Sequence, residues 1–270
     1  MPEPAQPTDA LAAAIARLYD LDLSEDPGDV DLYRALARRT AGPIVELAVG
    51  TGRIAVPLAE DGYHVVGVDN DRGMLDRARA RMAGAGREIA GRIRLVERDL
   101  VGADKDEAVA SGGPYSLAIL GLNSILLLAT VAGQRGALAT MARLLAPGGL
   151  AVVDAWQPSP ADLVAFDGRL SLEWLRTDPA TGRDVTKTLA AWYEHLRRIV
   201  TLTTVFEEGT PGEPAVRWTR SDALRLVSGD ELVAFAETAG LEVEQLAGDY
   251  ELGPLEPGSD RVVLVARKPA

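Results

Sequence analysis

The feature that most constrains the fold is a loop of small residues between two apolar runs. In VELAVGTGRIAVPLAEDGYHVVGVDND, residues 45–71, the first run ends in a loop with alanine or glycine at positions 48, 50 and 52. The second run, HVVGVD, ends in the acid Asp69. Short apolar runs of this kind are typical of buried parallel strands, and the segment between them has helical character. The stretch therefore predicts a strand, a ligand-binding loop, a helix and a second strand.

The same alternation continues along the first half of the chain. Segments with helical spacing separate a predicted strand of mixed composition at residues 92–100 and apolar runs at 115–121 and 150–156, and two further helices are predicted near the N-terminus. Helices that alternate with continuously apolar strands indicate an α/β fold. We therefore expect a doubly wound, Rossmann-like parallel sheet.

The pattern changes after Trp156. Polar and apolar residues now alternate, and turn clusters such as DPATG and GTPGEP separate the segments. This pattern predicts antiparallel strands with one solvent-facing side. We therefore expect a helical cover over residues 1–40, a Rossmann-like domain over 41–157 and 221–270, and an antiparallel lid sheet inserted at 158–220. The exposed edge strands of that lid are compatible with a homodimer.

Composition excludes several kinds of site and partner. The 270 residues include no cysteine, which rules out disulfides, zinc–thiolate sites, iron–sulfur ligation and a cysteine nucleophile. No cluster of metal-ligating residues stands out in the sequence, so no metal is expected. The net charge of −12 disfavours a nucleic-acid substrate, because phosphate contacts need a basic face.

Targeting and membrane signals are also missing from the pattern. The N-terminal stretch MPEPAQPTDA is polar and proline-rich, unlike a secretory signal, so we expect a cytoplasmic protein. Residues 108–134 carry no charged side chain, but glycines and a proline interrupt them. This stretch predicts a buried strand, a polar loop and a core-facing helix rather than a membrane segment.

The spacing of the small residues distinguishes between two cofactors. A dinucleotide loop has the pattern G-x-G-x-x-G, whose third glycine lets helix and strand pack closely under a pyrophosphate. Here Arg53 stands where that glycine would be, and the spacing is instead [GA]-x-G-x-G. The acid Asp69, at the end of the second strand, suits a ribose diol with either cofactor.

At these residues the chain resembles the class I methyltransferases that use S-adenosylmethionine. Their first motif places an acid two residues before a loop of the form G-x-G-x-G. Glu46 and the loop 48–52 match it, with alanine in place of the first glycine. The resemblance continues through Asp69, through ERDL at 97–100 and through LLAPGG before the next predicted strand. It covers about residues 40 to 156.

The resemblance implies a role for each matching residue. Asp69 would accept hydrogen bonds from both ribose hydroxyls, and Asp99 would accept one from the adenine amino group. Met74 and Leu100 would enclose the adenine ring, while Glu46 would act at the methionine end. The full set of cofactor residues that the resemblance implies is Tyr19, Glu46, Ala48, Gly50, Gly52, Asp69, Asn70, Met74, Asp99, Leu100 and Leu122.

The resemblance also implies a substrate cleft beside the transferring methyl group. The inserted sheet resembles the lids of small-molecule methyltransferases, including relatives of the amino-sugar and glycine N-methyltransferases. The candidates for substrate contacts are Tyr33, Asn123, Ser124, Trp156 and Trp192. The candidate for a general base is His195, and Tyr193, on the same face of the predicted strand, is a second catalytic candidate.

The resulting interpretation is methyl transfer from S-adenosylmethionine to a nitrogen or oxygen of a small molecule. Three alternatives stay open. A cofactor-binding protein without catalysis would share every motif that concerns the cofactor. An NAD(P)-dependent reductase is disfavoured by Arg53 and by the lack of any Tyr-x-x-x-Lys pair, and a nucleic-acid methyltransferase is disfavoured by the charge.

Overall fold

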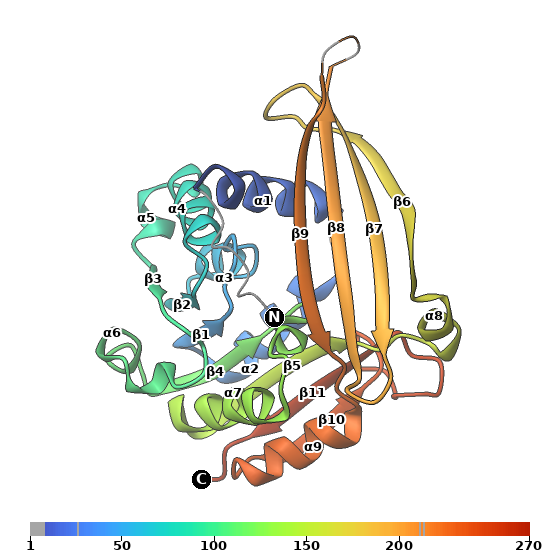
Figure 1. Ribbon diagram of the computed structural model, residues 1–270. Coiled ribbons are helices and arrows are strands. Elements are labelled where there is room, and N and C mark those ends of the chain that lie inside the picture. Colours follow the sequence, from blue (N-terminus) through green and yellow to red (C-terminus); the bar gives the residue numbers. More distant parts are fainter. Residues whose placement is uncertain (1–8, 26, 211, 213) are drawn as a thin grey trace.

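The computed structural model describes residues 9–25, 27–210, 212 and 214–270. It contains two sheets that stand beside each other, with most helices around the larger one (Figure 1). The larger sheet has seven strands in the order β10-β11-β5-β4-β1-β2-β3. Its strands are β1 (Ile44–Leu47), β2 (Val65–Asp69), β3 (Ile93–Glu97), β4 (Tyr115–Leu120), β5 (Leu145–Trp156), β10 (Glu242–Ala247) and β11 (Arg261–Arg267).

The pairing in this sheet is mostly parallel. Strands β1 to β5 pair in parallel, and β11 pairs antiparallel with both β5 and β10. All four residues of β1 and the five central residues of β11 are buried. Strands that are covered on both faces have to be apolar on both sides, which explains the continuous apolar runs in the sequence. The predicted doubly wound, Rossmann-like fold is confirmed.

Helices cover both faces of the larger sheet. One face packs against α2, α3 and α4, and the other packs against α7 and α9. The helices are α1 (Asp9–Asp22), α2 (Asp29–Thr40), α3 (Ala55–Glu60), α4 (Arg72–Ala85), α5 (Arg87–Ala90), α6 (Glu107–Ala110), α7 (Val131–Leu144), α8 (Pro160–Ala165) and α9 (Gly229–Thr238), with 3-10 turns η1 (Ala103–Lys105) and η2 (Ser124–Leu127). Within the described ranges, none of them is both long and apolar enough to span a bilayer.

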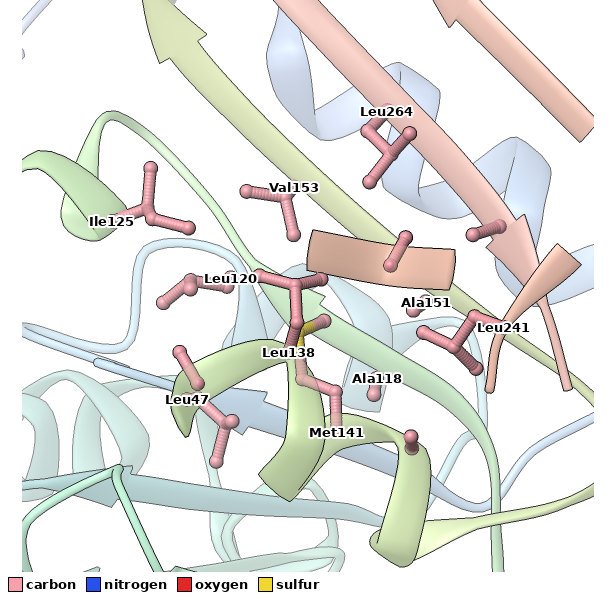
Figure 2. Packing of buried hydrophobic residues seen from close by; sticks show 14 of the residues in the cluster. Leu47, Ala118, Leu120, Ile125, Leu138, Met141, Ala151, Val153, Leu241 and Leu264 are labelled. Atoms are coloured by element: carbon pink, nitrogen blue, oxygen red, sulfur yellow. The ribbon is translucent and has the colours of Figure 1, made fainter. Parts of the chain in front are cut away.

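Figure 2 shows the packing of α7 on the sheet. Leu138 and Met141 of α7 lie over Leu120 of β4 and Val153 of β5, and all four side chains are fully buried. Because successive residues of a strand face opposite sides, Ile119 packs on the other face with α2 and α3. Burial of each large apolar side chain contributes about 1.5–3 kcal/mol. These two layers therefore fix where the carboxyl ends of the strands lie.

The smaller sheet has four antiparallel strands in the order β6-β7-β8-β9. They are β6 (Asp167–Thr177), β7 (Asp184–Glu194), β8 (Ile199–Gly209) and β9 (Val216–Arg225). One face is turned toward α1, and the described helices leave the opposite face open (Figure 1). Strand β9 continues to Arg225, beyond the predicted end of the insertion at residue 220.

Helix α1 lies between the two parts of the molecule. Ile15, Leu18 and Leu21 pack on the smaller sheet. On its other side α1 contacts α4, where a Cβ atom on Gly73 would lie only 2.9 Å from the backbone of Ala12. Glycine at position 73 therefore permits this close approach, and α1 is positioned by both neighbours.

Candidate functional site

The loop after β1 has a backbone conformation that residues other than glycine rarely adopt. Ala48, Gly50 and Gly52 have φ values of 59°, 54° and 76°, all in the left-handed region. Glycine adopts such values readily, whereas a residue with a Cβ atom is strained there. A Cβ atom on Gly50 would meet no other atom within 4 Å, because this residue borders a cavity. The backbone of the loop thus forms part of the cavity wall.

Asp69 joins this loop to the end of β2. Its carboxylate accepts hydrogen bonds from the backbone N–H groups of Gly50 and Asp71, each at 2.8 Å. Burial raises the pKa of Asp69, although the hydrogen bonds from these N–H groups oppose the shift. A carboxylate that lines a cavity at the carboxyl end of a parallel strand is well placed to accept hydrogen bonds from a diol.

A cavity of about 230 Å³, called the first cavity below, lies at the carboxyl ends of β1, β2 and β3. Open α/β sheets bind their ligands at this edge. Met74 of α4 and Leu100 after β3 give it apolar surfaces suited to a flat ring. Its lining residues are Tyr19, Ala48, Gly50, Asp69, Asn70, Asp71, Met74, Arg98, Asp99, Leu100, Ser124, Leu127, Leu128 and Arg220. Most of the residues predicted to bind the cofactor are among them.

A narrow space of about 20 Å³ borders the same loop and reaches Glu46, Thr51 and Arg53. The side chain of Glu46 is buried, and its Oε2 atom has no hydrogen-bond partner in the described part of the chain. Burial raises the pKa of Glu46 well above its usual value, and the nearby charge of Arg53 opposes the shift. An unpaired buried carboxylate oxygen is costly, so this end of the site suits a ligand that brings a hydrogen-bond donor or a positive charge.

A second cavity, of about 300 Å³, lies between α1, the turn after β4 and the inner face of the smaller sheet. Tyr19 and Arg220 border both the first and the second cavity, so the two meet at these side chains. The remaining residues that line the second cavity are Ile15, Asp22, Leu23, Leu122, Asn123, Lys187, Leu202, Thr204, Phe206 and Asp222.

Two ion pairs give the second cavity its charge. Lys187 Nζ lies 2.6 Å from Asp22 Oδ2, and Arg220 Nε lies 2.7 Å from Asp222 Oδ2. Trp174 Nε1 also donates a hydrogen bond to Asp22 at 2.8 Å. The cavity therefore presents both signs of charge beside apolar walls, which suits a small polar molecule with donors and acceptors.

Tyr19 is held where the cavities meet. Burial raises its pKa to about 12, so its hydroxyl keeps its proton at neutral pH. The next residue, Asp20, accepts hydrogen bonds from Thr51 Oγ1 at 2.7 Å, from Arg77 at 2.6 Å and from Arg81 at 2.7 Å. Because Thr51 belongs to the loop after β1, these bonds fix the position of Tyr19 relative to that loop.

The turn after β4 also borders the second cavity. Leu122 and Asn123 have φ values of 48° and 66°, two consecutive residues in the left-handed region. Such positions cost about 1–3 kcal/mol each and persist where the surroundings hold them. Asp154, fully buried on β5, accepts hydrogen bonds from the Leu122 N–H at 2.8 Å, from the Tyr250 hydroxyl at 3.1 Å and from the Tyr33 hydroxyl. This network holds the turn in its strained form.

Residues 44–149 match a family model described as a methyltransferase domain. Over this range the chain is similar to methyltransferase domains. The matched range contains β1 to β4 and the loop after β1, and it supports the prediction of a class I, S-adenosylmethionine-dependent methyltransferase. The unpaired Oε2 atom of Glu46 would fit the ammonium group in the methionine part of S-adenosylmethionine, the cofactor that this prediction implies.

Individual relatives of this chain are also methyltransferases. A demethylmenaquinone methyltransferase of Clavibacter sepedonicus is 30% identical over 142 residues, 51% of this chain. Those residues span about half of that relative, 52% of its length. The solved structure of the CcbJ methyltransferase from Streptomyces caelestis is 25% identical, covers 99% of both chains and has a TM-score of 0.71.

A third relative shares the fold at lower identity. The structure of S-adenosylmethionine-bound CalS10, an amino pentose methyltransferase from Micromonospora echinaspora, is 21% identical. The structural match covers 99% of this chain and 100% of the CalS10 chain, with a TM-score of 0.66. Because the likeness extends over nearly the whole chain, the smaller sheet and α1 belong to the shared fold.

Several residues that the sequence pointed to lie away from the first and the second cavity. Tyr33 is fully buried, and Trp156 packs beneath the smaller sheet. Trp192 is 58% exposed, and His195 is exposed in the turn after β7, with its ring edge-on to Tyr193. None of these residues lines the first or the second cavity, so a base at His195 stays a prediction that the geometry does not favour. Gly52 also lies outside them, where a Cβ atom would pack 3.4 Å from Ala78.

The charged residues of the smaller sheet were not among the predicted site residues. Lys187, Arg220 and Asp222 line the second cavity, and Asp22 joins them from the end of α1. A signal was present in β9, where Arg220 and Asp222 alternate with small polar residues and so share one face. Which face meets the cavity depends on strand pairing, which this pattern does not specify.

Proposed function

We propose that the protein transfers the methyl group of S-adenosylmethionine to an amino nitrogen of a small polar molecule in the second cavity. The supporting observation is that both cavities meet at Tyr19 and Arg220. A cofactor with its adenosine in the first cavity and its methionine part near Glu46 would have its sulfonium close to this junction. Its methyl group would then face the second cavity.

We propose the following contacts for the cofactor. Asp69 would accept hydrogen bonds from the ribose hydroxyls, and Asp99 would accept one from the adenine amino group. Met74 would pack on the adenine ring, and Glu46 would receive the ammonium group. Bound in this way, the cofactor supplies a methyl group that is already activated for displacement.

The chemistry of the second cavity supports nitrogen over oxygen as the acceptor. A hydroxyl needs a strong base to remove its proton. A protonated amine loses its proton more readily, and the neutral amine is then a nucleophile. Tyr19, with its pKa near 12, does not act as a base at neutral pH. The other titratable groups of the described lining are held in the ion pairs Asp22–Lys187 and Arg220–Asp222. The two carboxylates can still bind an ammonium group of the acceptor.

The chain's own contribution to the reaction is alignment and exclusion of water. The nitrogen lone pair would attack the methyl carbon while the carbon–sulfur bond breaks and leaves its electrons on sulfur as a neutral thioether. The methylated ammonium would then lose its proton to solvent. Holding the two reactants in line can supply about 7–11 kcal/mol of the rate enhancement. Leu122, Leu202 and Phe206 provide apolar walls around this path, and the smaller sheet acts as the lid over it.

The same proposal extends to the organisation of the chain. Residues 1–40 would form the cover, 41–157 and 221–270 the cofactor domain, and 158–220 the main part of the lid. The net charge of −12 supports a small molecule rather than a nucleic acid as the partner. We further propose that the protein is a homodimer.

Paired acceptors test the choice of nitrogen. Small amines and the matching alcohols are incubated with S-adenosylmethionine, and the formation of S-adenosylhomocysteine and of methylated product is followed by mass spectrometry. We expect product from amines only, and Asp222→Asn should raise the KM for the amine while the cofactor Kd is unchanged. Asp230→Asn, at an exposed position on α9, is the matched control and should change neither. Methylation of the alcohols alone would contradict the proposal.

A further inference from the structure

The second cavity contains more charged hydrogen-bond donors than the chain itself uses. An ammonium group has three N–H donors, and the hydrogen bond that Lys187 Nζ makes within the described ranges goes to Asp22 Oδ2, at 2.6 Å. Arg220 donates from Nε to the two oxygens of Asp222, at 2.9 and 2.7 Å, while its two terminal nitrogens bond to no described residue. Both cations line this cavity, so donors that carry positive charge remain for a bound molecule.

Two uncharged donors add to this excess. The hydroxyl of Tyr19 makes no hydrogen bond to the part of the chain that the structure describes. Asn123 uses its Oδ1 atom to accept from the Trp156 N–H at 2.6 Å, which leaves its amide N–H groups for the cavity. Among the described residues, the buried side-chain atoms without a partner are Arg34 Nε and Glu46 Oε2. The donors of the second cavity are not in that group, so they are accessible to a molecule in it.

The oxygen atoms of the cavity's two carboxylates already accept hydrogen bonds. Asp22 accepts one from Trp174 Nε1 at 2.8 Å and one from Lys187. Asp222 accepts at both oxygens from Arg220. A second lone pair on each oxygen can still receive an amino group. The remaining donors therefore need a molecule that brings oxygen atoms of its own.

The carboxylate of the cofactor does not use these donors in the proposed binding mode. The narrow space at the methionine end is bordered by Glu46 and Arg53, and neither Lys187 nor Arg220 borders it. Lys187 also lies outside the lining of the first cavity. The positive charge of Lys187 is therefore presented to the methyl acceptor rather than to the cofactor.

The strand pairing places the two cations on either side of β8. Lys187 is opposite Phe206, and Arg220 is opposite Thr204. With strands ~4.8 Å apart and a rise of ~3.4 Å per residue, their Cα atoms are about 12 Å apart, and both long side chains extend over β8. The cavity of about 300 Å³ is at the small end of the range for ligand pockets. One small molecule can therefore contact both cations.

We propose that the methyl acceptor is a small amine that also carries an anionic group, a carboxylate or a phosphate, and that Lys187 and Arg220 bind this group. Hydrogen bonds between charged groups of this kind are roughly twice as strong as those between neutral groups. The net charge of −12 repels anions at long range, so this selection depends on direct contact with the two cations. The inference rests on the proposed transfer to an amine, and it adds which amines are selected.

Matched pairs of amines that differ in the anionic group test the proposal. The pairs are β-alanine with β-alaninamide, γ-aminobutyrate with γ-aminobutyramide, and phosphoethanolamine with ethanolamine. Each is incubated with S-adenosylmethionine, and the methylated product is followed by mass spectrometry. The anionic member should have a kcat/KM at least about tenfold above that of its neutral partner. Whether the carboxylate pairs or the phosphate pair show the larger ratio identifies the anionic group.

Substitutions of lysine separate a specific contact from a general loss of activity. Lys187→Met should lower the ratio within each pair by at least about fivefold, whereas Lys187→Arg, which keeps the charge, should retain the preference. The matched control is Lys105→Met, because Lys105 is exposed and lines neither cavity. It should leave the ratio unchanged. Calorimetric binding of S-adenosylhomocysteine shows that each variant is folded.

Calorimetry with the same pairs, added to the complex with S-adenosylhomocysteine, distinguishes this proposal from the proposed reaction. If the anionic members bind more tightly, Lys187→Met removes the difference and no amine is methylated, the anion site stands and the reaction is wrong. If amines are methylated but the anionic and neutral members react equally well, this proposal is overturned and the reaction stands. A preference that is the same in Lys187→Met as in wild type would also overturn it.

Discussion

Asp69→Ala would remove the acceptor of two backbone hydrogen bonds and, in the proposed binding mode, the partner of the ribose. Leaving a buried N–H unpaired costs about 1–3 kcal/mol, but Gly50 and Asp71 are only partly buried and water can replace part of each bond. We therefore expect a loss of roughly 1–2 kcal/mol in the free energy of unfolding. Loss of the ribose contacts should weaken cofactor binding by a further 1–3 kcal/mol, or about 5- to 150-fold in Kd.

Thermal unfolding and calorimetric titration with S-adenosylhomocysteine measure the two effects separately. The control is Thr130→Ala, which removes the N-cap of α7, where Thr130 Oγ1 accepts from the Gly133 N–H at 3.0 Å. It should cost about 0.5–2 kcal/mol of stability and leave the Kd unchanged, because Thr130 lines neither cavity. If Asp69→Ala binds the cofactor as tightly as wild type, the ribose assignment is refuted.

Four further predictions concern the same region. Burial raises the pKa of Glu46. Without cofactor, the contribution of Glu46 to the free energy of unfolding is therefore present at low pH and lost as the pH rises through the raised pKa. Glu46→Gln should flatten this dependence of the free energy of unfolding on pH. Over the same window the affinity of wild type for S-adenosylmethionine should rise with pH in calorimetry, and a flat profile would argue against an ammonium partner. Ala48→Gly should relieve the backbone strain at φ 59° and raise the free energy of unfolding by up to about 1 kcal/mol. The gain is limited because glycine loses more conformational entropy on folding. A lower melting temperature would contradict this prediction. Asp154→Asn should lower kcat with little change in cofactor Kd, because the Leu122 turn loses a charged acceptor, and an unchanged kcat would show that the turn needs no such support.

Much of the cofactor half was predictable from sequence because its signals are local. The apolar run before Ala48 and the one that ends at Asp69 indicate buried strands, and strand ends in a parallel sheet meet at one edge. Once that fold is expected, Glu46, Asp69 and Asp99 must lie near each other. The first cavity bears out this expectation for Asp69 and Asp99, and Glu46 borders the adjoining narrow space.

The second cavity was less predictable because it depends on contacts between distant segments. Lys187 faces Asp22 across the gap between β7 and the end of α1, a pairing set by tertiary packing. In the sequence, Tyr33 resembles a tyrosine on the surface of a helix, yet its hydroxyl donates a hydrogen bond to the buried Asp154. His195 stood out because histidine titrates near neutral pH, but it falls in the exposed turn after β7.

A crystal structure with S-adenosylhomocysteine and an amine acceptor would show whether the methyl group is transferred where the two cavities meet. We predict the cofactor sulfur at the junction formed by Tyr19 and Arg220, with the acceptor nitrogen in line with it from the second cavity. A cofactor that binds in the first cavity with its sulfur turned away from Tyr19, or an acceptor bound outside the second cavity, would contradict it.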